Sequence, residues 1–226
     1  MRRAMARSAD SAFLASLPGS PVSRTWGFER GAPVDRHYIE RFLQANAGDI
    51  RGAVLEFMDD AYTRRFGGDR VASSDVLEVV EGNAKATIVA DLTRAGELPA
   101  DRFDCIICTQ VLQMIFDVRA AVHGLCRLLR PGGVVLVTGS GISKVGRHLG
   151  VDPWGEYWRF TEQSLTLLLN DAFAGGSVSV ESYGNVLTAT AFLYGIAADE
   201  LSEHDLARRD LDYELLVAGR AQKASG

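Results

Sequence analysis

Short apolar runs alternate along the chain with longer segments of mixed polarity. The candidate strands among these runs lie at Ala53 to Phe57, Val71 to Val76, Ala86 to Ala90, Phe103 to Cys108 and Val134 to Thr138. A polar or helical segment follows each run, which is the order of strand, crossover and strand found in parallel sheets. The pattern predicts an α/β fold with a doubly wound, Rossmann-like sheet and helices on both faces.

Two of the intervening segments carry the spacing of amphipathic helices. In "QMIFDVRAAVHGLCRLL" apolar residues recur every three or four positions, and the helix is expected to end at "RPGG". "TEQSLTLLLNDAF" begins with Thr161 in a capping position and places its apolar residues on one side. Near the end of the chain, "SVSVESY" and "DYELLVAGRA" alternate as strands, with a helix from about Val186 to Ala198 between them. This helix can cover the sheet or face a partner subunit, so the pattern leaves a homodimer open.

The length of the chain sets the number of domains. A chain of 226 residues with 47% hydrophobic residues can bury one substantial core. We therefore predict a single domain over residues 1–226. Residues 1–20 are expected to form a mobile or loosely docked arm, residues 21–50 a helical cap, and residues 51–226 the Rossmann-like core.

Charge and hydropathy exclude several classes of partner. The net charge of -5 provides no basic surface for nucleic acid. No run of about 18 apolar residues is present, so no membrane span is expected. Asp10 and Ser11 interrupt any signal-peptide core near the N-terminus. These features predict a cytoplasmic protein that binds neither nucleic acid nor membrane.

The cysteines do not indicate a disulfide framework or a metal site. There are three, an odd count, and Cys105 and Cys108 form a C-x-x-C inside a predicted strand. Residues three apart on a strand point to opposite faces of the sheet, so these two thiols are expected to be separate core residues. No cluster of His, Cys and carboxylate residues has metal-ligand spacing, and we predict no metal.

Several predicted strands end in polar residues, and in a doubly wound sheet the ligand binds beyond these carboxyl ends. Glu56 ends the first run, Asp75 the second, and Asp91 follows the third, while Thr109 and Gln110 end the fourth. Asp75 lies about 20 residues beyond the first turn, where a carboxylate that accepts ribose hydroxyls is expected. Each acid also has a simpler interpretation as a turn, capping or strand-end carboxylate.

The order of several short motifs resembles one known family. The motifs are "VLE", "SDV", "ADL", "FDCIICTQVLQMIFDVRAAVHGLCRLLRPGGVVLVTGSGIS" and "EYWRFT". Together they are similar to the class I S-adenosylmethionine-dependent methyltransferases, in particular to small bacterial members found beside glycosyltransferases and natural-product pathways. The resemblance implies a seven-stranded sheet whose last strand runs antiparallel.

The resemblance also implies a set of cofactor-binding residues. Glu56 would hold the methionine part of S-adenosylmethionine, Asp75 the ribose, Asp91 and Leu92 the adenine, and Thr109 and Gln110 would lie beneath the sulfonium. The full predicted set is Glu56, Met58, Asp75, Val76, Asp91, Leu92, Thr109 and Gln110. The family pattern E-x-G-x-G has glycines where this chain has Met58 and Asp60. A closer pattern, E-x-G-D-D-x-Y-T-R-R-F, leaves only Met58 atypical.

Acceptor-side candidates lie before the sheet and after its fifth strand. We predict catalytic roles for His37, Tyr38 and Tyr157, and substrate contacts for Trp26, Glu40, His148, Trp154 and Trp158. Each has a structural alternative: His37 or Tyr38 can pack a helix, the two tryptophans can cover a sheet edge, and His148 can be a solvated loop residue.

These observations favour methyl transfer from S-adenosylmethionine to an O, N or C nucleophile of a small-molecule acceptor in natural-product or sugar biosynthesis. The first alternative is a methyltransferase-like scaffold that has lost catalysis, for which Met58 is the best argument. The second is a nicotinamide-dependent oxidoreductase, which Asp75 would suit but which requires a G-x-G-x-x-G turn that this chain lacks.

Overall fold

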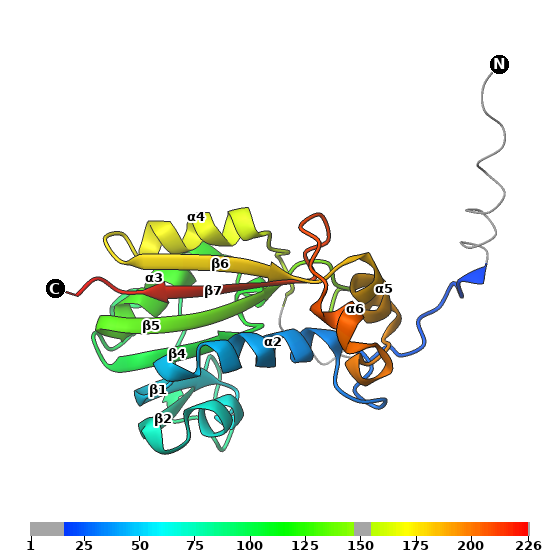
Figure 1. The fold of residues 1–226 in the computed structure, drawn as a ribbon. Coiled ribbons are helices and arrows are strands. Elements are labelled where there is room, and N and C mark those ends of the chain that lie inside the picture. The colour runs from blue at the N-terminus through cyan, green and yellow to red at the C-terminus, as the bar shows by residue number, and fades with distance from the viewer. Residues whose placement is uncertain (1–15, 147–154, 226) are drawn as a thin grey trace.

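A seven-stranded sheet forms the centre of the protein, in a computed structural model that describes residues 16–146 and 155–225. The strand order is β3-β2-β1-β4-β5-β7-β6. β1 pairs in parallel with β2 and β4, β2 with β3, and β4 with β5, whereas β7 is antiparallel to both of its neighbours. The predicted Rossmann-like sheet with an antiparallel last strand is confirmed (Figure 1).

The strands and helices follow the predicted order along the chain. The strands are β1 (Gly52–Phe57), β2 (Val71–Glu78), β3 (Ile88–Val89), β4 (Phe103–Thr109), β5 (Leu129–Ser140), β6 (Ser177–Tyr183) and β7 (Leu216–Gln222). The α-helices are α2 (Val34–Ala45), α3 (Val118–Leu128), α4 (Glu162–Ala172), α5 (Val186–Tyr194) and α6 (Glu203–Ala207). A π-helical segment, η2 (Thr63–Gly67), and short 3-10 turns connect them.

Each face of the sheet has its own hydrophobic core. One core contains α3 and α4 packed on residues such as Ile106, Cys108 and Val135, and the other contains α2 and α5 packed on residues such as Cys105 and Leu136. Alternate residues of β4 and β5 therefore enter opposite cores, as the period of a strand requires. The prediction that Cys105 and Cys108 point to opposite faces is confirmed, and burial raises the pKa of both thiols.

Local capping explains where the helices begin and end. Asp117 accepts a hydrogen bond from the Ala120 N–H and starts α3, and Thr161 forms a capping box with Ser164 at the start of α4, as predicted. Asn185 forms a similar box for α5, which ends at Gly195 in a left-handed conformation.

β2, β3 and β5 are among the strands that differ from their predicted bounds. β2 extends to Glu78, so the predicted end of this strand near Asp75 is wrong. β3 is only Ile88–Val89 and lies at the sheet edge. β5 begins at Leu129 and runs through the "RPGG" segment, where the register against β4 shifts. A bulge admits the proline and glycines that would interrupt a regular ladder.

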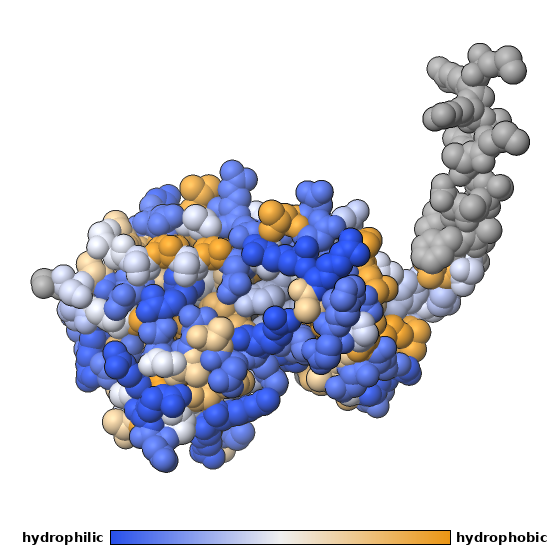
Figure 2. Space-filling model, viewed as in Figure 1, coloured by the Kyte–Doolittle hydropathy of each residue, from blue (hydrophilic) through white to orange (hydrophobic). Residues whose placement is uncertain are grey.

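The carboxyl ends of the parallel strands face a cover made of α5, α6 and the segment before α2 (Figure 1). Pro33 pairs with Ala197, and the N–H groups of Val22 and Ser23 donate to the Tyr194 carbonyl. Figure 2 shows a mostly hydrophilic surface on which apolar side chains gather over α5 and this N-terminal segment. Residues 1–15 of the predicted arm lie outside the described residues. Within the described part of the chain, no helix has the length and apolar character that crossing a membrane requires.

Candidate functional site

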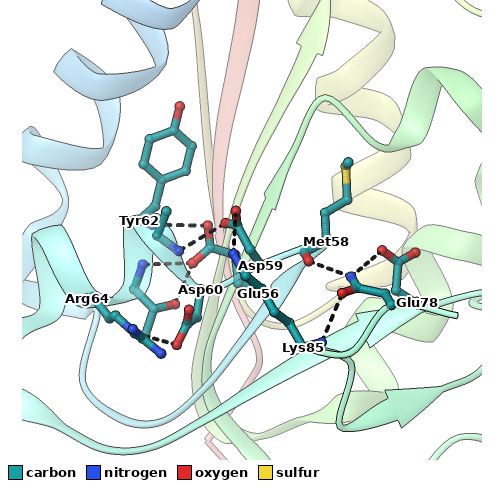
Figure 3. Close-up of polar contacts among 11 residues, drawn as sticks. Glu56, Met58, Asp59, Asp60, Tyr62, Arg64, Glu78 and Lys85 are labelled. Carbon is teal, nitrogen blue, oxygen red and sulfur yellow. Dashed lines mark hydrogen bonds and ion pairs between the residues drawn. The ribbon is translucent and has the colours of Figure 1, made fainter. Parts of the chain in front are cut away.

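The turn after β1 is organised by a buried carboxylate. Glu56, only 3% exposed, accepts hydrogen bonds from the Thr63 N–H and hydroxyl, both at 2.7 Å, and from the Tyr62 N–H at 3.2 Å. Its side chain thus binds the N-terminal end of the helical segment that contains η2 (Figure 3). Through these contacts Glu56 orients the segment that follows β1.

The protonation of Glu56 depends on two opposing effects. Burial raises the pKa of Glu56 to about 7, although the hydrogen bonds from Thr63 and Tyr62 act in the opposite direction. The negative charge of Asp59 raises the same pKa further. The carboxyl group at the end of β1 therefore changes charge near neutral pH.

Met58 adopts a backbone conformation that glycine favours. Its φ is 68°, in the left-handed region, and its side chain is 66% exposed. The turn that family members make with glycine is therefore made here with methionine, and the thioether lies outside the core. The Asn83 side chain donates from Nδ2 to the Met58 carbonyl at 2.7 Å (Figure 3).

The carboxylate at the end of β2 is Glu78 rather than Asp75. Asp75 pairs with Leu55 in mid-sheet, where it accepts a hydrogen bond from Thr87 at 2.6 Å and forms an ion pair with Arg102 at 2.8 Å. Glu78 is half-buried and lies beside Met58. The Asn83 side chain contacts both residues, and its Nδ2 donates to Glu78 Oε1 at 2.9 Å. The predicted position of Asp75 at the ligand edge is wrong because β2 is longer than its apolar run.

Charged side chains surround this turn. Asp59 accepts from the Ala61 N–H and lies 3.5 Å from the Lys85 ammonium group. Asp60 forms an ion pair with Arg64 at 2.6 Å, one helical turn away (Figure 3). Of these contacts, the pair of Asp59 and Lys85 joins the segment after β1 to the loop that connects β2 and β3.

The residues predicted near the adenine occupy different environments. Asp91 accepts hydrogen bonds from the Thr93 N–H and hydroxyl, as its alternative interpretation as a turn cap predicted. Leu92 is 3% exposed within the α3 core, and Val76 is 4% exposed inside β2. Both side chains therefore fill the core, and contact of either residue with the cofactor stays a prediction.

The end of β4 is a second left-handed turn. Gln110, with φ 59°, follows Thr109, and its N–H donates to the Thr138 carbonyl. Its side-chain oxygen accepts hydrogen bonds from Gln113 at 2.5 Å and from Ser140 at 2.8 Å.

Three buried polar atoms in this network have no hydrogen-bond partner among the described residues: Gln110 Nε2, Gln113 Oε1 and Thr138 Oγ1. Buried polar groups normally have partners. Unpaired donors and acceptors at a strand end are suited to the ammonium and carboxylate groups of an amino-acid ligand. The donor set therefore fits the methionine part of S-adenosylmethionine.

The three predicted residues of α2 have different environments: Tyr38 is buried, whereas His37 and Glu40 are half-buried. Tyr38 is 1% exposed and its ring stacks on that of Tyr183, so its ring fills the core and its catalytic role stays a prediction. Burial lowers the pKa of His37, whose Nε2 is buried and unpaired within the described residues. Glu40 forms an ion pair with Arg65 at 2.6 Å, which occupies its carboxylate.

An aromatic group adjoins the end of β4. Tyr157 and Trp158 are 51% and 38% exposed, and both contact Phe116, which is 71% exposed. The N–H groups of Tyr157 and Trp158 donate to the Gln113 carbonyl, so the group adjoins the polar network. The predicted substrate residues His148 and Trp154 lie outside the described residues.

Trp26 joins the N-terminal segment to the segment after β5. Its φ is 58°, and the Lys144 ammonium group lies 3.2 Å from the centre of its ring. This pair brings the segment before α2 close to the segment after β5.

Sequence reasoning missed four residues of the site: Glu78, Asn83, Gln113 and Phe116. Glu78 follows the apolar pair Val76 and Leu77, and this extension of the run was the available signal. Asn83 and Gln113 had no comparable signal, because each acts through contacts with a distant strand end. Within the described ranges, no group of three or more His, Cys, Asp or Glu residues could hold a metal ion.

Comparisons with known proteins agree with this geometry. Residues 47–137 match a family model described as a methyltransferase domain. No curated protein sequence matches the chain significantly.

Solved structures with the same fold share little sequence with the chain. A methyltransferase from Archaeoglobus fulgidus has 12% identity and a TM-score of 0.54, with 83% of this chain and 94% of that chain covered. One from Mesorhizobium loti has 16% identity and a TM-score of 0.53, with 84% and 98% covered. SpnF, a cyclase, has 18% identity and a TM-score of 0.55, with 87% and 84% covered. These structures confirm the fold predicted from the sequence, and the family model matches the part of the chain that contains β1 to β4 and most of β5.

Proposed function

Since residues 47–137 match a methyltransferase family model, we propose that the protein transfers a methyl group from S-adenosylmethionine to an O, N or C nucleophile of a small-molecule acceptor. The observation that carries this proposal is the arrangement at the carboxyl edge of β1, β2 and β4. There, two left-handed turns, the Glu78 carboxylate and a network with unpaired polar atoms face the ligand edge of the sheet.

We assign the cofactor contacts by the chemistry of each group. Glu78 would accept hydrogen bonds from the ribose hydroxyls, since it ends β2. Gln110 and Gln113 would contact the amino-acid part, and Asp91 stays a candidate for the adenine edge. Glu56 shapes the turn from behind. The proposed cofactor site thus keeps most of the predicted strand ends and replaces Asp75 by Glu78.

Bound S-adenosylmethionine supplies a methyl group that is already activated on a cationic sulfur. The protein therefore has to orient the acceptor and exclude water, and it needs a base only where the nucleophile carries a proton that must leave. Tyr157 is the exposed candidate for contact with that nucleophile. His37 remains a second candidate, and its lowered pKa keeps the imidazole neutral, as a base requires.

The acceptor is proposed to be a compound with an apolar, planar part. Phe116, Tyr157 and Trp158 offer ring faces or edges near the polar network, and aromatic rings bind planar groups well. Trp26 stays a predicted substrate contact. A natural-product or sugar-linked aromatic acceptor suits this surface. The cytoplasmic location and the homodimer stay predictions.

The proposal is tested by calorimetry with S-adenosylmethionine and S-adenosylhomocysteine, followed by a search for methylated products in a panel of small aromatic and glycosylated acceptors. We expect micromolar binding of both nucleosides and no binding of NAD. Absence of heat at millimolar S-adenosylmethionine would contradict the proposal and favour the scaffold alternative.

Cofactor binding without methyl transfer would point to a different reaction. The same fold is found in SpnF, which is described as a cyclase. Fold alone does not determine the reaction, so the product assay is essential.

A further inference from the structure

Asn83 links the ends of two neighbouring strands through one amide group. It lies in the loop between β2 and β3, and its Nδ2 donates to the Met58 carbonyl at 2.7 Å and to Glu78 Oε1 at 2.9 Å (Figure 3). An amide nitrogen has two hydrogens, so both bonds can be made at once. The ends of β1 and β2 are therefore tied at the place where the cofactor is proposed to bind.

The orientation of this amide is fixed by a third contact. The Asn83 side-chain oxygen accepts a hydrogen bond from the Lys85 N–H at 3.0 Å, in a local turn. If the amide were reversed, its oxygen would face two other acceptors and its nitrogen would face an N–H donor. All three contacts therefore require the same orientation.

The two groups that Asn83 contacts both need external support. Met58 has a φ of 68°, which is unfavourable for a residue with a side chain, so the turn needs contacts that hold it. The Glu78 carboxylate is half-buried at the end of a strand, and one hydrogen bond to Oε1 restricts its rotation. A fixed carboxylate loses less freedom when a ligand binds.

We propose that Asn83 is a positioning residue for the cofactor: it holds the left-handed turn at Met58 and orients the Glu78 carboxylate toward the ribose hydroxyls. The role of Glu78 in this statement rests on the proposed function, whereas the support of the turn does not. Asn83 acts through these two groups and needs no contact with the reacting atoms.

A positioning role and a purely structural role of Asn83 predict different effects of its substitution on unfolding and on cofactor binding. A loop residue that only stabilises the fold would affect unfolding and leave the contribution of Glu78 to binding unchanged. A residue that acts through Glu78 should make the effects of the two side chains depend on each other. The double-mutant cycle of Asn83→Ala and Glu78→Gln measures this dependence.

Asn46 provides a matched control. Its Nδ2 also donates to a backbone carbonyl, that of Phe42 at 2.9 Å, but it lies after the C-terminal end of α2, at the opposite edge of the sheet. Asn46→Ala therefore removes the same kind of bond without touching the strand ends.

The first measurement is calorimetric binding of S-adenosylhomocysteine. We expect Asn83→Ala to weaken binding about tenfold, Glu78→Gln about 30-fold and the double variant about 30-fold, whereas Asn46→Ala should bind like wild type. Independent effects would give about 300-fold for the double variant and would overturn the proposal. Unchanged affinity in Asn83→Ala would overturn it as well.

The second measurement needs no ligand. Hydrogen exchange of the amides in residues 57–62 should become faster in Asn83→Ala and stay unchanged in Asn46→Ala. Unchanged exchange in both variants would overturn the support of the turn. If wild type does not bind the nucleoside, the proposed function fails and so does the role of Glu78, but this exchange experiment still decides whether Asn83 holds the turn.

Discussion

The turns after β1 and β4 stabilise the same left-handed backbone conformation in different ways. These strands are neighbours in the centre of the sheet, and each is followed by a non-glycine residue with left-handed φ: 68° at Met58 and 59° at Gln110. Met58 directs an exposed side chain away from the core, and its carbonyl is held from outside by Asn83. Gln110 instead uses its own side chain, which accepts hydrogen bonds from Gln113 and Ser140.

The difference shows which of the two turns depends on the side chain of its left-handed residue. At β4 the side chain of the strained residue makes the stabilising contacts, so the residue and its conformation belong together. At β1 the contacts come from Glu56 and Asn83, and the side chain of Met58 contributes none of the hydrogen bonds that hold the turn. The β1 turn should therefore tolerate a change at its strained position, whereas the β4 turn should not.

The largest effect is expected from removing the buried support of the β1 turn. Glu56→Ala would leave the Tyr62 N–H and the Thr63 N–H and hydroxyl without their partner in a buried place. We expect the free energy of unfolding to fall by about 3 kcal/mol, measured by urea denaturation. A loss below about 1 kcal/mol would show that the turn does not depend on this carboxylate.

A pH series tests the charge of Glu56 while its side chain stays in place. Burial raises the pKa of Glu56 to about 7 in the folded protein, from an ordinary value of 4.5. The folded state therefore holds the proton more tightly than the unfolded chain. The resulting stabilisation is fully present below pH 4.5 and is lost as the pH rises to about 7.

Over this range the contribution of Glu56 should fall by about 3 kcal/mol. Glu56→Gln cannot titrate, so the stability difference between wild type and this variant should change across that range and be constant above it. A difference that does not vary between pH 4.5 and 7 would contradict the raised pKa.

Glu78→Gln tests the ligand side of the β1 turn. The substitution keeps the size of the side chain but weakens its ability to accept hydrogen bonds from two hydroxyl groups. We expect cofactor binding to weaken by about 2 kcal/mol, while the unfolding free energy changes by less than about 0.5 kcal/mol. Asp75→Asn is the comparison variant, and it should lower stability through the Arg102 pair more than it lowers affinity. If Asp75→Asn weakened cofactor binding more than Glu78→Gln did, Asp75 would again be assigned to the cofactor site.

The smallest effects compare the two strained residues directly. Met58→Gly should raise the unfolding free energy by about 0.5 kcal/mol, since relief of the left-handed backbone outweighs the flexibility of glycine in the unfolded chain. Gln110→Gly relieves the same conformation but removes the partner of Gln113 and Ser140, so we expect a loss of about 1 kcal/mol. Changes of the same sign in both variants would show that the two turns do not differ in the way described.

The order and type of the elements could be predicted because apolar runs and capping residues act locally. Thr161 starts α4 and Cys105 and Cys108 separate across the sheet, and both follow from spacing alone. The end of β2 could not be fixed in this way. Asp75 interrupts the apolar run, yet it sits within the strand because Thr87 and Arg102 satisfy its carboxylate there. Such partners are distant in sequence, so periodicity gives no sign of them.

The site residues show the same limit more strongly. Glu56, Met58 and Gln110 were predicted at strand ends. Three-dimensional contacts decide that Glu56 supports the turn, that Met58 forms it and that Gln110 belongs to a hydrogen-bond network. Tyr38 looked like a polar residue at a helix start, and its ring instead stacks on Tyr183 in the core. A tyrosine in a sequence does not show whether the fold will use its hydroxyl group or its aromatic ring.

The antiparallel direction of β7 has a practical consequence for handling this protein. After Gln222 the chain leaves the sheet at the amino edge, opposite the turns at Met58 and Gln110 (Figure 1). A dye, a surface linker or a fused reporter placed after β7 would therefore sit at the far end of the molecule. Attachment near residues 18–33 would instead disturb the cover over α5, so immobilised binding assays should use the C-terminal side.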